Sequence, residues 1–255
     1  MLICPVKWLQ KLGMMHTGTL SCPGTSNAFS LPAKRCGNKQ HRELCRSLRR
    51  YMQSNRPAEL IRFLLDCQAL KFGDFTLKSG AKSPFFIDLG NIRTGRQLDI
   101  LGDFMAAAIQ AHFPDTTIIF GPAYKGIALA VAAATSYWRM SGRDLGVVFD
   151  RKEAKAHGEG GSYIGVQPTS SDRVLLIDDV LTSGLTKREG IDSLRRTFGV
   201  ASADILVIVD RRSKAGAADD DLQFSSLLDI RALIECLAET GDARAELIQK
   251  WWETA

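Results

Sequence analysis

The sequence predicts an α/β fold in which helices flank a central parallel sheet. Two observations predict it. Four short apolar runs, typical of strands buried on both faces, alternate with segments whose apolar residues recur at helical spacing. Each run is also followed by polar or glycine-rich residues, as expected where parallel strands end at a ligand-binding edge. The 255 residues are enough for one such domain with a well-covered core.

The first elements are expected to precede the parallel strands. Apolar residues recur there at helical spacing: Leu60, Ile61, Leu64 and Leu65. They predict an opening helix from Pro57 to Leu70, with the proline in the first turn, where a missing N–H costs little. The runs FTLKSG (75–80) and SPFFIDLG (83–90) predict two short strands around a turn at Gly80, and a helical stretch follows from Gln97 to His112.

The four apolar runs are the strands of the predicted sheet. They are TIIFG (117–121), LGVVFD (145–150), VLLID (174–178) and ADILVIVD (203–210). Helical segments at 126–140 and 186–198 separate them, so right-handed crossovers are expected to place the strand ends at one crevice. The segment from Arg151 to Asp172 has no helical period and is predicted to be a long loop.

The third strand ends in two adjacent carboxylates, Asp178 and Asp179, followed by a Thr/Ser/Gly loop from Thr182 to Thr186. The amides of such a loop and the N-terminus of the next helix favour an anion such as phosphate. Two acids beside a phosphate would repel it unless they face another part of the same ligand, for example neighbouring hydroxyls. The pattern therefore predicts a phosphorylated sugar. The simpler alternative is that the acids only cap the following turn.

The segment after the second strand, DRKEAKAHGEGG (150–161), reads as a closing lid. It supplies cationic or protonatable groups from Arg151, Lys152, Lys155 and His157, and three glycines supply mobility. Such cations would meet a polyphosphate, with lysine as a point charge and arginine as a bidentate clamp. Taken alone, the segment is equally well explained as a solvated charged loop.

Residues 1–54 differ in composition from the rest of the chain. They hold nine of the 33 Lys and Arg residues and one of the 28 acids, which leaves 24 bases and 27 acids in the remainder. The basic pI therefore belongs to this leader, and no nucleic-acid partner is expected for the slightly acidic remainder. Apolar stretches are far shorter than the ~20 residues that cross a bilayer, so no membrane partner is expected either.

Two explanations of the leader compete. Its mixture of Pro, Gly, Ser, Thr and basic residues has no sustained period, as in a disordered or processed segment. It is either an organelle transit peptide, although MLICPVKWLQ lacks a clear amphipathic, Arg-bearing helix, or a stretch upstream of a true start at Met52. The start at Met52 is favoured because a recognisable domain begins directly after it with NRPAELIRFLLDCQAL. Four of the six cysteines lie in it without a Cys-x-x-Cys pair, so no zinc site or disulfide framework is predicted. The domain is expected to span residues 55–255.

Four motifs in a fixed order carry a resemblance to a known family. They are LKFGDFTLKSGAKSPFFIDLG (70–90), GPAYKG (121–126), DRKEAKAHGEGG (150–161) and VLLIDDVLTSG (174–184). From about Asn55 onward the chain resembles the orotate phosphoribosyltransferases, a branch of the type I phosphoribosyltransferases. The acid pair alone would indicate only the superfamily, whereas the lid and the Lys-Ser-Gly segment point to the orotate branch. The resemblance implies a small hood subdomain, built from the N-terminal part of the domain and the C-terminal region, beside the parallel sheet.

The resemblance also implies a pentosyl transfer. Orotate and 5-phosphoribosyl 1-pyrophosphate (PRPP) would give orotidine 5′-monophosphate and pyrophosphate in de novo pyrimidine (UMP) biosynthesis. Magnesium (Mg²⁺) would be held mainly through the substrate pyrophosphate, with no metal site made by the protein alone. A cytoplasmic homodimer is implied, in which the lid of one subunit serves the site of the other.

Most of the site residues that the resemblance implies belong to the PRPP site. Lys155, Asp178 and Asp179 would be catalytic: Lys155 would neutralise the leaving pyrophosphate, and the acids would face the ribose 2′- and 3′-hydroxyls. Carboxylates suit that place because C1′ becomes cationic as pyrophosphate leaves. The remaining PRPP-binding residues would be Lys78, Tyr124, Lys125, Arg151, Lys152, His157, Val180, Leu181, Thr182, Ser183, Gly184, Leu185 and Thr186.

The resemblance implies an orotate site made by Phe86, Ile87, Thr182 and Arg211, with Arg211 suited to the carboxylate of the base. For Phe86 and Ile87, a place in the strand core is the alternative. One residue departs from the family pattern: Leu185 follows Gly184, where the family usually has a small hydroxyl residue. The lost donor would weaken PRPP binding by roughly 1 kcal/mol.

Two rival functions are less favoured. A phosphoribosyltransferase for a purine base would share the acid pair but need another base pocket, and the lid is of the orotate type. A regulator that binds PRPP without turning it over could dispense with the lid cations, which are present here. No helix-turn-helix segment is apparent in the leader. Consumption of orotate in the presence of PRPP and magnesium discriminates among the three.

Overall fold

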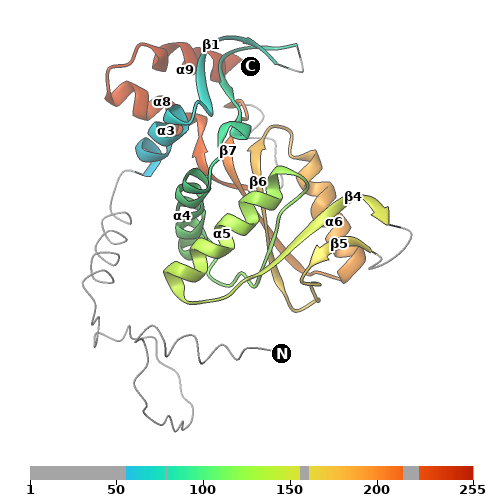
Figure 1. Cartoon of the computed structure of the whole chain (residues 1–255). Helices are drawn as coiled ribbons and strands as arrows, with labels where there is room; N and C mark the ends of the chain where they lie inside the picture. The colour runs from blue at the N-terminus through green and yellow to red at the C-terminus, as the bar shows by residue number, and fades with distance from the viewer. Residues whose placement is uncertain (1–55, 78–79, 156–160, 215–223, 255) are drawn as a thin grey trace, which may run out of the picture. The chain divides into compact units, whose positions relative to one another are not determined.

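Six strands form the main sheet in the computed structural model, which describes residues 56–77, 80–155, 161–214 and 224–254 (Figure 1). Their order across the sheet is β5-β4-β3-β6-β7-β8. The strands are β3 (Ile118–Phe120), β4 (Gly146–Lys155), β5 (Gly161–Gly165), β6 (Arg173–Leu181), β7 (Ser202–Asp210) and β8 (Phe224–Asp229). Neighbours are parallel except β4 and β5, so the predicted parallel sheet is confirmed.

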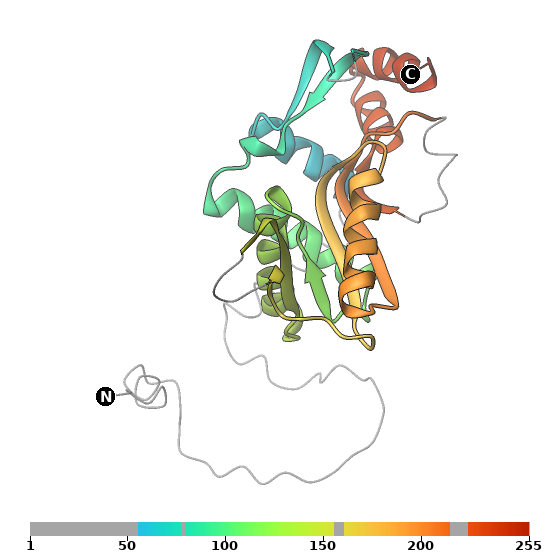
Figure 2. The same cartoon turned by 90° about the vertical axis from the view of Figure 1, so that its right-hand side faces the viewer.

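Helices cover both faces of this sheet (Figure 1, Figure 2). They are α4 (Gly95–His112), α5 (Lys125–Ser141) and α6 (Leu185–Phe198), close to the predicted bounds. Leu175 and Ile177 of β6 belong to the core cluster of α4 and α5, whereas Val174 and Leu176 belong to the cluster of α6. Successive strand side chains point to opposite faces. The uniformly apolar run therefore reflects a strand that is covered on both sides.

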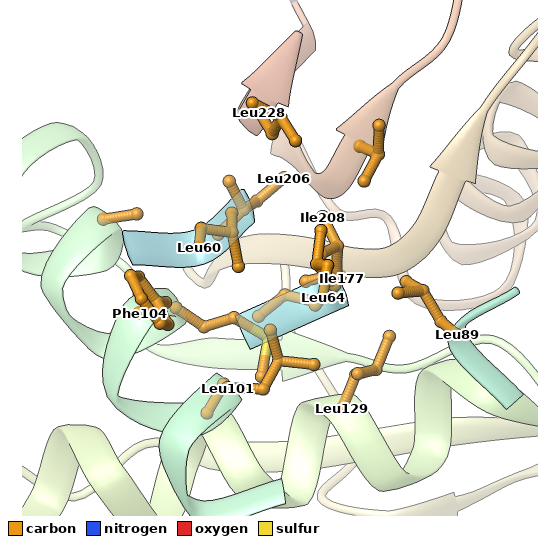
Figure 3. Packing of buried hydrophobic residues seen from close by; sticks show 14 of the residues in the cluster. Leu60, Leu64, Leu89, Leu101, Phe104, Leu129, Ile177, Leu206, Ile208 and Leu228 are labelled. Atoms are coloured by element: carbon orange, nitrogen blue, oxygen red, sulfur yellow. The ribbon is translucent and has the colours of Figure 1, made fainter. Parts of the chain in front are cut away.

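The larger core also anchors the opening helix, α3 (Arg56–Asp66). Figure 3 shows Leu60 and Leu64 of this helix among side chains of the sheet and of α4. Both leucines are at most 1% exposed. Each contributes about 1.5–3 kcal/mol by leaving water, so the apolar spacing that predicted the helix also fixes its place.

A second, smaller group of elements forms the hood. Its elements are α3, the antiparallel pair β1 (Leu70–Thr76) and β2 (Lys82–Ile87), and the helices α8 (Ile230–Glu239) and α9 (Arg244–Thr254). α3 packs on α8, and α9 packs on β2. Trp251 of α9 donates its Nε1–H to the carbonyl of Lys82 at 2.9 Å and meets the Phe85 ring edge-on. The hood implied by the family resemblance is confirmed, with both ends of the domain in it.

The predicted loop from Arg151 to Asp172 is wrong for residues 151–155 and 161–165, which lie in strands. β4 continues to Lys155, and β5 returns antiparallel to it, with Tyr163 opposite Asp150. The run GSYIG (161–165) is too short to show a strand or helix period of its apolar residues. It is held as an edge strand because Tyr163 packs against Phe120 and Phe198 and donates a hydrogen bond to Ser193 at 2.7 Å.

Two boundaries in the hood also differ from the prediction. α3 ends at Asp66 rather than at Leu70, because Leu70 already begins β1. Gln68, with φ of 55°, turns the chain between the two elements. The strand predicted from residue 75 accordingly begins five residues earlier, and Gly80 lies at the turn before β2, as expected.

Candidate functional site

The acid pair lies at the carboxyl end of β6, within the strand's last residues. Asp178 accepts hydrogen bonds on both oxygens, from the Asp179 amide at 2.8 Å and from Lys187 Nζ at 2.8 Å. Asp179 also uses both oxygens, accepting from the Val180 amide at 2.7 Å and from Lys125 Nζ at 2.9 Å. Each acid therefore has a lysine of its own.

Lys125, the first residue of α5, comes from the GPAYKG motif that follows β3. Burial would lower the pKa of this lysine, but the hydrogen bond that it donates to Asp179 and the charges of Asp179, Asp88 and Asp178 raise it above its ordinary value. Its side chain is 53% exposed. The ammonium is thus charged, held at the acid pair, and accessible to a ligand.

The turn before α5 is built by close backbone contacts. A Cβ on Gly126 would lie 2.6 Å from Pro122 Cδ and 3.1 Å from the Ile177 carbonyl oxygen, so only glycine lets α5 approach β6 here. The Ala123 amide donates to Asp150 Oδ1 at 2.6 Å, which ties the turn to β4. Tyr124 is 70% exposed above it.

The loop from Thr182 to Thr186 leads from β6 into α6 and leaves its polar groups accessible. Gly184 is the N-cap of α6, has φ of 73°, and has no side chain that could cap the helix. A Cβ there would lie 2.8 Å from the Phe224 ring. Thr182, Ser183, Leu185 and Thr186 are exposed. An uncapped helix N-terminus flanked by hydroxyls is a favourable anion site.

Arg211 follows β7 and lies between the sheet and the hood. Its guanidinium carbon is 5.3 Å from the centre of the Phe85 ring and 5.7 Å from that of Trp251. Its amide donates to the Leu181 carbonyl at 3.0 Å. Burial lowers the pKa of Arg211, and among the described residues its buried Nε and Nη2 have no hydrogen-bond partner. Buried donors without an acceptor are typical of a site that awaits one from a ligand.

The two other predicted base-site residues of the hood differ from each other. Phe86 is 38% exposed, and its ring centre lies 5.4 Å from that of Phe75. Ile87 is half-buried and packs against the main core. Phe86 is therefore accessible to a ligand, whereas the packing of Ile87 alone would explain its apolar character.

Several predicted residues are brought together and others lie outside the described part. Lys125 contacts Asp179 directly, and Val180 and Leu181 connect the acids to the loop. Arg151 continues β4, with a buried Nε that has no partner among the described residues. Lys78 and His157 are not among the described residues, nor are the leader and the proposed start at Met52. Lys152 and Lys155 belong to β4, and their side chains are likewise outside the described part.

Sequence reasoning missed four residues of this region: Asp150, Lys187, Phe85 and Trp251. Lys187 falls in the helical segment expected from residue 186, where a lysine is usually read as solvent-exposed. Trp251 is far from the motifs in sequence and reaches Arg211 only through the fold of the hood. A signal existed for Asp150, which opens the lid motif, and for Phe85, which lies in the motif at 70–90.

Comparisons with known proteins agree with this geometry. A family model described as "Phosphoribosyl transferase domain" matches residues 89–234. An orotate phosphoribosyltransferase of Salmonella arizonae is 39% identical over 206 residues, which cover 76% of this chain and 95% of that protein. The chain belongs to the orotate phosphoribosyltransferase family. A family member from Bifidobacterium adolescentis is 45% identical over 163 residues, which cover 62% of this chain and 71% of that protein.

A crystal structure of the Francisella tularensis orotate phosphoribosyltransferase superposes with a TM-score of 0.66 and 31% identity. The match covers 80% of this chain and 100% of that one. Family membership makes the protein a pentosyltransferase with the type I phosphoribosyltransferase fold, as the four motifs indicated. None of the described helices is both long and apolar enough to span a membrane.

Proposed function

We propose that this enzyme transfers the 5-phosphoribosyl group of PRPP to orotate, giving orotidine 5′-monophosphate and pyrophosphate in pyrimidine biosynthesis. The observation that carries the proposal is the acid pair at the end of β6, each acid with its own lysine, beside the uncapped N-terminus of α6. Arg211, with buried donors that lack an acceptor in the described structure, would bind the base at the other end of the site. We also propose that residues 55–255 carry this activity.

The acid pair and the loop would hold the ribose 5-phosphate part of PRPP. In this arrangement Asp178 and Asp179 face the ribose hydroxyls, and the loop from Thr182 to Thr186 holds the phosphate with its amides and hydroxyls. As the bond from C1′ to pyrophosphate breaks, positive charge develops on C1′. Fixed carboxylates stabilise that charge more than they stabilise the ground state, which is what lowers the barrier.

Cationic side chains would stabilise the negative charge that develops on the departing pyrophosphate. Lys125 and Arg151 are the described residues of this set, with Tyr124 beside them. The family motif adds Lys78, Lys152, Lys155 and His157, and we assign Lys155 the leading role. Closure of the lid that carries Lys155 would exclude the water that otherwise hydrolyses PRPP.

Arg211 would bind the orotate carboxylate, because a guanidinium pairs with a carboxylate through two parallel hydrogen bonds. The rings of Phe85 and Trp251 hold the guanidinium in place by cation–π contact. Thr182, Phe86 and Ile87 complete the proposed base site. The ring nitrogen of orotate would then bond to C1′ as the C1′–O bond to pyrophosphate breaks, and the N–H proton would pass to the departing pyrophosphate or to solvent.

Magnesium is proposed as the cofactor and would be shared with the substrate. Among the described residues no group of three His, Cys, Asp or Glu side chains could hold a metal. Magnesium typically binds substrate phosphates together with few protein ligands, and here the pyrophosphate of PRPP would hold it. The metal, when bound, would neutralise charge at the pyrophosphate, while Asp178 and Asp179 would orient the ribose.

We further propose a homodimer in which the lid serves the neighbouring site. Supporting it, large side chains stand exposed along one side of α5 and its N-cap: Tyr124, Val131 and Trp138, at 70%, 49% and 56% exposure. Their spacing of seven residues places them on one stripe. Such an apolar stripe is typical of an interaction surface. Because α5 begins at the PRPP site, a second copy docked here would bring its own chain close to that site.

A cytoplasmic location is part of the proposal. In the described part of the chain, Cys67 and Cys236 are free thiols, as is usual for proteins of a reducing compartment.

The test mixes the purified chain with orotate, PRPP and magnesium and follows the loss of orotate absorbance. Adenine and hypoxanthine are the matched controls, followed by the formation of their nucleotides. The proposal expects turnover with orotate alone. Turnover of a purine base in place of orotate would identify a purine-type enzyme, and PRPP binding without turnover of any base would identify a regulator.

A further inference from the structure

Lys187 occupies an unusual place for a lysine. It is the third residue of α6, and it is 6% exposed, the only charged side chain among the buried residues that the structure describes. The N-terminal turn of a helix disfavours a cation, because the helix dipole is positive there. Burial of a charge is also unfavourable unless it is paired. An apolar side chain of the same length would pack equally well in this position.

The contacts of Lys187 show what offsets these costs. Its Nζ donates to Asp178 Oδ2 and to the Val180 carbonyl oxygen, both at 2.8 Å. The other Asp178 oxygen accepts the Asp179 amide at 2.8 Å. The Asp178 carboxylate is therefore fixed on both oxygens, and its charge is matched by a buried cation.

The second acid is held differently. Lys125, the partner of Asp179, is 53% exposed, whereas the side chain of Lys187 is 7% exposed. Lys125 is free to turn toward a ligand, and Lys187 is enclosed between β6 and α6. Binding of a polyphosphate can thus draw Lys125 away from Asp179 while Asp178 keeps its lysine.

We propose that Lys187 is a positioning residue for the sugar-phosphate end of PRPP: it orients the Asp178 carboxylate and offsets its charge, so that a phosphate can bind beside two acids. This inference rests on the proposed function only for the identity of the ligand. Without Lys187, a phosphate in the loop from Thr182 to Thr186 would meet the uncompensated carboxylate of Asp178.

The charge of the Lys187–Asp178 pair makes the test quantitative. Lys187→Met leaves the pair with one negative charge, Asp178→Asn leaves it with one positive charge, and the double variant is neutral like the wild type. For inorganic phosphate we expect Lys187→Met to bind about tenfold more weakly, as for the loss of one charge contact. The double variant should recover most of that loss, and Asp178→Asn should bind at least as tightly as wild type. Phosphate affinity is measured on the full chain by calorimetry.

Enzyme kinetics and matched variants complete the experiment. Lys187→Met should raise the KM for PRPP and leave that for orotate within about twofold, and Lys187→Arg should recover most of the loss. Arg195→Met, which removes an exposed cation from the same helix, should change neither. If Lys187→Met does not fold, Asp178→Asn and the double variant still differ by the lysine alone, and about a tenfold difference in phosphate affinity is expected between them.

Three outcomes would overturn the inference: a folded Lys187→Met with wild-type phosphate affinity, a double variant no better than Lys187→Met, or no difference between Asp178→Asn and the double variant. Failure of the proposed function is recognised separately, because wild-type chain would then not consume orotate, whatever its phosphate affinity.

Discussion

Lys125 Nζ lies 2.9 Å from Asp179 Oδ2, although the two residues are 54 positions apart and belong to different elements. The contact joins the turn after β3 to the end of β6, which are neighbouring parallel strands. Two of the motifs that carried the family resemblance therefore meet in one ion pair. Strand ends of a parallel sheet gather at one edge, which is why motifs distant in sequence form one site.

Lys125→Met should reduce activity with little effect on folding. Because the side chain is half exposed, its ion pair contributes only about 0–1 kcal/mol to stability. The loss of a cation at the pyrophosphate should raise the KM for PRPP, and thermal melting should be unchanged within error. Steady-state kinetics and a melting curve check both statements. A variant that melts normally and keeps the wild-type KM for PRPP would remove Lys125 from the site.

The raised pKa of Lys125 also sets a pH window. The small stabilisation that its ion pair gives is fully present below the ordinary lysine value of 10.5 and is lost as pH rises through the higher pKa of the folded state. Deprotonation of Lys125 therefore does not limit activity near neutral pH. A decline in kcat/KM between pH 7 and 9 that disappears in Lys125→Met would contradict this.

Arg211→Met should raise the KM for orotate and leave the KM for PRPP unchanged. Removing a guanidinium that binds a carboxylate costs about 1.5–3 kcal/mol, so the KM for orotate should rise roughly tenfold to a hundredfold. Folding should not suffer, because the change removes buried donors that lack a partner among the described residues. Arg231→Met, at an exposed arginine of α8, is the control. An equal rise in the KM for PRPP would contradict the assignment of Arg211 to the orotate carboxylate.

Leu185→Thr restores a hydroxyl to the phosphate loop. Leu185 is 62% exposed, so the substitution removes no core packing. We expect a lower KM for PRPP, by about fivefold for a hydrogen bond of roughly 1 kcal/mol, with the KM for orotate nearly unchanged. Leu247→Thr on α9, also exposed, is the matched control. A KM for PRPP that stays the same or rises would mean that residue 185 does not face the phosphate.

Mixing of inactive variants tests the shared lid. Lys155→Ala and the double variant Asp178→Asn/Asp179→Asn should each be nearly inactive as pure dimers. After random subunit exchange at equal amounts, half of the dimers are mixed and each has one complete site. About a quarter of wild-type activity should return. No recovery after verified exchange would place the lid over its own subunit's site.

The sequence predicts the parallel sheet well because its strands are buried on both faces and read as apolar runs. Leu175 and Leu176 belong to opposite cores, so both positions must be apolar. The edge strand β5 escaped prediction because it is short, flanked by glycines and half exposed. Strand β8 and the helices α8 and α9 were not predicted one by one, and the contact of Trp251 in α9 with Phe85 joins residues far apart in sequence.

The family resemblance predicts the acid pair and Arg211 as site residues, but it does not predict the side chains that pair with them or pack against them. Lys187 looks like an ordinary helix lysine in sequence, and only the packing of α6 on β6 shows that it is buried against Asp178. Likewise, the cation–π contacts of Arg211 depend on the docking of α9. Local sequence patterns predict candidate ligand-binding groups, whereas the charges and rings around those groups depend on the tertiary fold.

The central claim is that the acid pair of β6 drives phosphoribosyl transfer to orotate. Its most direct test is the rate of orotate loss with saturating PRPP and magnesium for Asp178→Asn/Asp179→Asn, compared with wild type and with Asp192→Asn, an exposed acid of α6. With folding verified by circular dichroism, kcat of the double variant should fall about a hundredfold or more, while Asp192→Asn keeps the wild-type rate. A folded double variant that retains wild-type kcat would contradict the account.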